Sequence, residues 1–302
     1  MMLYFLFHVA LAGPIEDAIA LRRGGDIPGA RNLLLAMEPL VTDGERGWYL
    51  YQRGVCEELD NHPDRAEGLY REAIDVGGDT VLDAHFRLAL VLEDQHRDAE
   101  ALREIVGLDH VKGLEERDEI TIALQRGITE VHTHHPRRGI RRISKALEIA
   151  DVGNTHAYMR SKARATLVEV ILSEADRLTL DGPERRMVRR LKRRAQAIKD
   201  AEAQIIELAG LQEPEWILAS LVALGDAYLS LGDAVASAPP PARLDAASAG
   251  IYRSEVAKKA ENAKTKAYHA WDSGVALATR LGYESPRVAV LKERRAQLEG
   301  AR

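Results

Sequence analysis

The clearest pattern in the chain is a pair of amphipathic segments within residues 47–75. Apolar positions recur every three or four residues on both sides of Asp60–Pro63, and this run of turn-forming residues interrupts the pattern. The pattern predicts two short helices joined in a hairpin. Small and large side chains stand at offsets that let antiparallel helices nest, with a tyrosine ring filling the gap above the small residues. These positions are Gly54, Ala66, Tyr70 and Ala73.

The same spacing recurs three more times, and the repeats start 35 to 38 residues apart. The matching sets are Ala18, Ala30, Leu34 and Met37, then Leu88, Ala89, Ala101, Ile105 and Leu108, then Gly127, Gly139, Ile143 and Ala146. These repeats resemble the tetratricopeptide family, whose signature places small residues and an aromatic at such offsets. The resemblance implies an all-α solenoid, because a single hairpin cannot bury its apolar face without a neighbour. We expect about four degenerate repeats within residues 13–152.

The helical patterns become longer in the second half, residues 153–302, which we expect to continue the solenoid. Their ends are marked by proline near a helix start and glycine after a helix end. Gly250 is a candidate break in the longest segment. The expected helices span 155–180, 183–209, 214–237, 242–281 and 285–298.

Composition supports an all-α fold. Only 5% of residues are aromatic, which disfavours a β-sandwich or barrel. The net charge of -5 gives no overall attraction to nucleic acid. Cys56 is the single cysteine, so an intramolecular disulfide and a cysteine zinc site are excluded, and we expect a buried thiol.

The first twelve residues have two interpretations. They are apolar through Leu11 and end in Ala10–Ala12, which indicates a short signal peptide (1–12) with Gly13 as the mature start. No lysine or arginine precedes the apolar run and His8 interrupts it, so the alternative is an uncleaved helix packed on the next repeat. The first interpretation places the protein in the periplasm and the second in the cytoplasm.

The region from Pro214 to Leu298 is similar to the C-terminal part of tetratricopeptide proteins from bacterial gliding-motility and cell-envelope machines. The resemblance implies a non-enzymatic, assembly-forming role in the envelope. The segments that carry it are Glu215–Ala219, Leu224–Tyr228, Ile251–Glu255, Lys264–Tyr268 and Leu281–Tyr283.

Signatures of catalysis or cofactor binding are absent from the sequence. It contains no phosphate loop, no H-E-x-x-H, no G-x-S-x-G and no EF-hand spacing, so we expect neither an enzyme nor a cofactor. His132, His134 and His135 form the one local cluster of metal-ligand type. No cysteine or aspartate completes a tetrahedral set nearby, and we expect no metal site.

The tetratricopeptide resemblance implies that the first helix of each repeat lines a concave groove. The family's groove positions fall here on Trp48, Tyr51, Val55, Asp83, Phe86, Leu90, Leu124 and Ile128. This set is largely apolar, and an open apolar groove marks an interaction site. We expect it to bind an amphipathic helix or extended segment of a protein partner, anchored by Tyr51 and Phe86. The alternative is that the chain fills its own groove.

A basic run from Glu184 to Lys199 is the strongest electrostatic feature. At 100° per residue, Met187, Leu191, Ala195, Ile198 and Ile205 share one face, while Arg186, Arg189, Arg190 and Arg193 share another. These arginines are candidate contacts to an anionic membrane surface or an acidic partner. The alternative is a solvated face neutralised by neighbouring carboxylates. No aromatic residues are interleaved with the basic ones, so we do not expect nucleic acid as a partner.

The sequence therefore predicts an exported scaffold that binds a protein partner and helps to assemble an envelope complex. The alternative is a cytoplasmic adaptor of the same fold.

Overall fold

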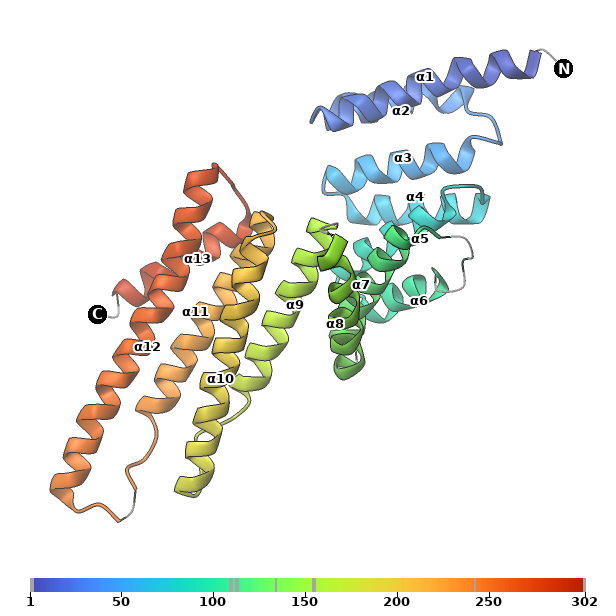
Figure 1. Cartoon of the computed structure of the whole chain (residues 1–302). Coiled ribbons are helices and arrows are strands. Elements are labelled where there is room, and N and C mark those ends of the chain that lie inside the picture. The colour runs from blue at the N-terminus through green and yellow to red at the C-terminus, as the bar shows by residue number, and fades with distance from the viewer. Residues whose placement is uncertain are drawn as a thin grey trace. The chain divides into compact units, whose positions relative to one another are not determined.

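The computed structural model describes residues 3–108, 111, 114–133, 135–153, 156–241 and 243–300, without the side chains of residues 3–12 and 153. All regular structure in these ranges is helical, which confirms the predicted all-α class (Figure 1). The first helices are α1 (Leu3–Arg23), α2 (Ile27–Met37), α3 (Arg46–Leu59), α4 (Pro63–Val76), α5 (Val81–Asp94), α6 (Asp98–Leu108), α7 (Glu116–His132) and α8 (Pro136–Gly153). A short 3-10 helix, η1 (Glu38–Leu40), follows α2. The later helices are α9 (Ala157–Asp176), α10 (Glu184–Ala209), α11 (Pro214–Ala236), α12 (Ala246–Leu281) and α13 (Pro286–Gly300).

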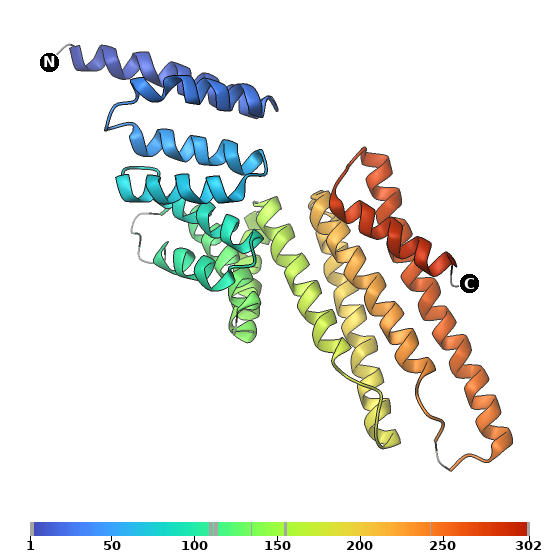
Figure 2. The same ribbon diagram turned by 180° about the vertical axis from the view of Figure 1, so that it is seen from behind.

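The chain divides into two compact units, Met1–Arg142 and Ile143–Arg302. In the first unit, consecutive helices pair into antiparallel hairpins, α1 with α2, α3 with α4 and α5 with α6, and α4 packs on α5 (Figures 1 and 2). Each hairpin covers the apolar face of the next, and one core runs through all three. This is the stacking that the repeat spacing predicts.

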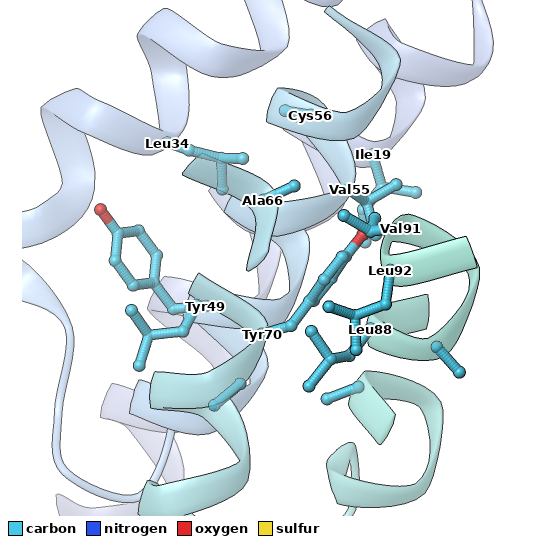
Figure 3. Close-up of a cluster of buried hydrophobic side chains, with 14 of the residues drawn as sticks. Ile19, Leu34, Tyr49, Val55, Cys56, Ala66, Tyr70, Leu88, Val91 and Leu92 are labelled. Carbon is cyan, nitrogen blue, oxygen red and sulfur yellow. The ribbon is translucent and has the colours of Figure 1, made fainter. Parts of the chain in front are cut away.

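The predicted small and large positions meet inside these hairpins. A Cβ on Gly54 would lie 2.6 Å from Cε1 of Tyr70, so the tyrosine ring occupies the space that a side chain there would need. Ala66, Tyr70 and Ala73 are fully buried (Figure 3). In the fourth repeat, a Cβ on Gly139 would lie 2.5 Å from the carbonyl oxygen of Gly127. The two helices therefore touch backbone to backbone where the sequence places glycines.

Each of the first three hairpins turns through a residue in the left-handed conformation. Gly25, Asn61 and His96 have φ values of 89°, 60° and 60°. They occupy equivalent positions, two residues before the second helix of each hairpin. Asn and His tolerate this conformation better than β-branched residues do. All three hairpins therefore share this left-handed turn residue, and only the first hairpin has a glycine there.

Cys56 is buried and free, as the sequence predicts. Burial raises the pKa of its thiol. Cys56 belongs to the same buried cluster as Ala66 and Tyr70 (Figure 3).

The second unit is built on the long helix α12. Helices α11 and α12 form its most extensive pair, and α9, α10 and α13 complete its core. Trp271 of α12 is buried against α11 at Gly225, where a Cβ would lie 2.1 Å from the indole Nε1. Small residues again permit the close approach of two helices. The five predicted helices are all present, with ends shifted by only a few residues.

Gly250 does not break α12, which runs unbroken over 36 residues. Its N-terminus is capped by Asp245, whose Oδ1 accepts a hydrogen bond from the Ser248 amide at 2.7 Å. This cap and the contact with α11 stabilise the first turns, so one exposed glycine is tolerated.

The backbone is helical from Leu3 to Arg23, through Pro14. The side chains of the expected signal segment lie outside the described part of the chain, and its cleavage stays a prediction.

Candidate functional site

The predicted groove residues fall into two groups. Trp48, Tyr51, Phe86 and Leu90 are half-buried, and Asp83 is exposed. Val55, Leu124 and Ile128 are at most 3% exposed and lie in the chain's own interior. Helix α7 is buried over every residue from Gln125 to Val131, so it has no open apolar face there. The accessible part of the predicted groove therefore lies on α3 and α5.

Charged and polar side chains link these first helices of successive repeats. Arg87 of α5 donates a hydrogen bond to Glu58 of α3 at 2.9 Å, and the hydroxyl of Tyr70 donates to the same carboxylate at 2.6 Å. Arg22 of α1 donates to Gln52 of α3 at 2.8 Å. Burial raises the pKa of Tyr51, against the opposing effect of Arg87. The groove surface is consequently more polar than the sequence positions alone predict.

A pocket of about 670 Å³ lies at one end of α3 and α5. Trp48 and Asp83 from the predicted groove line it, together with the loop before α3 and the loop between α4 and α5. The two loops come together because Gly47 has no side chain: a Cβ there would lie 2.5 Å from the carbonyl oxygen of Gly77. Gly77 and Gly78 have φ values of 85° and 100°, which favour glycine. The glycines thus form the pocket wall.

The pocket is acidic. Asp43, Asp79 and Asp83 all line it, and none of the three forms an ion pair within the described residues. Although Asp83 is exposed as a residue, partial desolvation of its carboxyl group raises its pKa, and the nearby Asp118 carboxylate raises it further, against the weaker effect of Arg87. Half-buried Trp48 adds an aromatic side chain to the same wall. Carboxylates beside an aromatic ring are suited to a cation.

The predicted basic face lies on α10 in the second unit. Arg186, Arg189 and Arg193 are exposed. Arg190 differs from the prediction, because it is half-buried and pairs with Asp181 at 2.6 Å. Arg194 also turns inward, to Asp176 at 2.7 Å. Asp181 lies in the loop before α10, and Asp176 lies at the end of α9. Through these two ion pairs, Arg190 and Arg194 hold α10 in place.

Helix α11 is the one described helix long and apolar enough to cross a membrane by length and composition. It packs against α9, α10, α12 and α13. We treat it as a core helix.

Among the described residues, no group of three or more His, Cys, Asp or Glu side chains is placed to hold a metal ion. His132 lies near Glu93, with Nδ1 3.9 Å from Oε1. His134 lies outside the described residues.

The hairpins of the first unit share antiparallel helix pairs, a repeat of 35 to 38 residues and small residues at the crossing, and in the second hairpin an aromatic ring, Tyr70, packs above them. These hairpins have a tetratricopeptide-like fold. The pocket with Trp48 and Asp83 lies at α3 and α5, the first helices of their hairpins.

No family model matches the chain, and no curated relative matches it. Among solved structures, the chain is similar to a tetratricopeptide repeat protein from Parabacteroides merdae, with 14% identity, a TM-score of 0.47 and coverage of 95% of this chain and 98% of the other. It is also similar to the C-terminal part of a TPR repeat-containing protein from Cytophaga hutchinsonii, with 10% identity, a TM-score of 0.46 and coverage of 95% and 96%. The tetratricopeptide-like description of this chain stands on its own hairpin packing.

Proposed function

We propose that this tetratricopeptide-like protein is a non-enzymatic scaffold that binds a basic segment of a protein partner at the acidic pocket of its first unit. The observation that carries the proposal is the set of three carboxylates, Asp43, Asp79 and Asp83, which line the pocket beside the half-buried Trp48 and form no ion pair within the described residues. A lysine or arginine side chain supplies the missing charge.

The contact would combine two kinds of interaction. A guanidinium or ammonium group over the indole of Trp48 gains about 0.5–1 kcal/mol at an exposed site. Carboxylates that accept charge-assisted hydrogen bonds from the same group add to this and fix its position. Phe86 and Leu90 follow Asp83 along α5 and are half-buried, so they offer apolar contacts to the flanking residues of the segment. The partner is therefore an extended or helical segment with at least one basic side chain.

Binding is tested with a fluorescein-labelled peptide of alternating arginine and serine, followed by anisotropy. Replacing Asp83 by asparagine should weaken binding about fivefold or more, equivalent to about 1 kcal/mol, because one accepting carboxylate loses its charge. The matched control is Asp17→Asn on α1, which removes an exposed carboxylate far from the pocket in the sequence and outside its lining. Equal affinity for a glutamate–serine peptide, or no loss in Asp83→Asn, would contradict the proposal.

Binding should also depend on pH in a defined direction. Partial desolvation and the nearby Asp118 carboxylate raise the pKa of Asp83, so this carboxyl takes up its proton at a higher pH than an ordinary aspartate. Affinity for the arginine peptide should therefore fall as pH decreases, beginning above the usual aspartate range. The Asp83→Asn variant should lose that part of the pH dependence.

We further propose that the scaffold is exported and acts in assembly of an envelope complex. The support is the apolar N-terminal run ending in Ala10–Ala12 and the resemblance of the C-terminal region to envelope proteins of this fold. Sequencing the N-terminus of the mature protein tests export: a start at Gly13 supports it, and an uncleaved chain in the cytosol favours the adaptor alternative.

A further inference from the structure

One face of α10 is rich in exposed cations. Residues 185–199 include no carboxylate, and the arc lies opposite the buried positions Ile198, Ala201 and Ile205. Asp200 follows on the same arc and accepts a hydrogen bond from the Gln196 side chain. We call this face the α10 stripe, and it consists of Arg185, Arg189, Lys192, Arg193 and Lys199. The stripe spans about 21 Å at 1.5 Å per residue.

None of the five stripe residues forms an ion pair or hydrogen bond within the described part of the chain, and all five are exposed. This separates them from Arg190 and Arg194, which are paired with Asp181 and Asp176. Two of the helix's arginines thus hold it in place, while the stripe is left without partners. Val188, 46% exposed, lies at the edge of the stripe and adds an apolar contact.

The first unit carries the complementary surface. Asp43, Asp79 and Asp83 line the pocket without a cation, and Asp118 lies close enough to Asp83 to raise its pKa. We propose that the α10 stripe docks on the acidic pocket of a second copy of this chain. The inference rests on the proposed function, since it names the protein's own α10 as a basic segment of the kind that the pocket takes.

The pocket is large enough to take one guanidinium group of the stripe. Arg189 and Arg193 are one helical turn apart, about 6 Å along the axis. One guanidinium can enter a pocket of about 670 Å³ beside Trp48 while the other reaches a carboxylate at its rim. Arginine also forms bidentate pairs with carboxylates, so two contacts fix the direction of the helix across the pocket.

The contact joins two different surfaces, so it is heterologous. Such contacts build open chains unless the rotation between copies closes a ring. Average mass should therefore rise with protein concentration. Because the contact is between exposed charges, added salt should weaken it.

Sedimentation of the full-length protein over a concentration series, at low and high salt, tests this inference. A stripe variant (Arg189→Gln with Arg193→Gln) and a pocket variant (Asp79→Asn with Asp83→Asn) should each lose self-association at least about tenfold. Mixed in equal amounts, the two variants should form a dimer that does not grow, since the mixture has one intact stripe and one intact pocket per pair. The control Arg137→Gln with Arg141→Gln removes two exposed arginines one turn apart on α8 and should behave as the unaltered protein.

A protein that stays monomeric at low salt at every concentration would overturn the inference. Self-association that survives in the stripe variant would also overturn it. If the monomer instead binds vesicles of anionic phospholipid through the stripe, the stripe's partner is a lipid surface and the inference fails. In each case the arginine peptide still tests the pocket by itself, so failure here is distinguishable from failure of the proposed function.

Discussion

Replacement of Glu130 by glutamine is expected to destabilise the first unit by about 3 kcal/mol. This carboxylate is 2% exposed and accepts from three arginines: Arg126, Arg138 and Arg142, each with Nε 3.1 Å from a carboxylate oxygen. Burial lowers the pKa of Arg126, and the nearby charge of Arg142 lowers it further, against the opposing effect of Glu130. Without the negative charge, the buried guanidinium of Arg126 is left close to those of Arg142 and Arg138 with no counter-charge from Glu130.

The measurement is urea unfolding followed by helical circular dichroism, with hydrogen exchange to locate the change in α7 and α8. Glu72→Gln is the control, because Glu72 is exposed on α4 and forms no ion pair within the described residues. It should change stability by less than about 0.5 kcal/mol. A Glu130→Gln protein as stable as this control would show that the cluster contributes nothing.

Replacement of Gly225 by alanine is expected to cost the second unit about 3 kcal/mol, near the upper end for overpacking. The added Cβ would lie 2.1 Å from Nε1 of Trp271 and 2.5 Å from two ring carbons. The indole is only 1% exposed and cannot swing into solvent, so α11 and α12 must separate.

A double-mutant cycle isolates this clash. In a Trp271→Leu background, which is itself destabilised, Gly225→Ala should cost at least about 1 kcal/mol less than in the natural sequence. Gly250→Ala in α12 is the control, because nothing lies within 4 Å of its Cβ position, and it should be neutral or slightly stabilising. If the stability costs of Gly225→Ala and Trp271→Leu simply add in the double variant, the two residues do not share this contact.

The hairpins could be predicted from the sequence because their contacts are local. Gly54 and Tyr70 meet within one helix pair, and helical periodicity alone fixes their faces. The same holds for Gly127 with Gly139. Helix ends were predicted within a few residues wherever proline or glycine marks them, as at Pro214 and Gly282.

The contacts between repeats were not predictable in the same way. Glu58 pairs with Arg87, and Glu67 pairs with Arg97, each across about one repeat length. Many charged residues of the sequence have the right sign for such pairs, and only the register between hairpins selects the partners. Arg190 shows the same limit, since the loop geometry that brings Asp181 to it is not a periodic feature.

The candidate site was predicted in part. Trp48 and Asp83 were assigned to the groove from the family's repeat positions, and both line the pocket. Its acidic character was missed, because Asp43 and Asp79 come from loops, which carry no helical period. The close approach of Gly47 to Gly77 that forms the wall is a contact over 30 residues. A pair of adjacent glycines before α5 was the one available signal.

The most direct test of the account is the indole N–H spectrum of the protein during titration with the arginine–serine peptide. The chain has three tryptophans, and only Trp48 lines the pocket. The account predicts that the Trp48 signal, assigned with a Trp48→Phe variant, shifts on titration while those of Trp216 and Trp271 stay in place. A titration that leaves Trp48 unmoved, or that moves Trp216 instead, would contradict it.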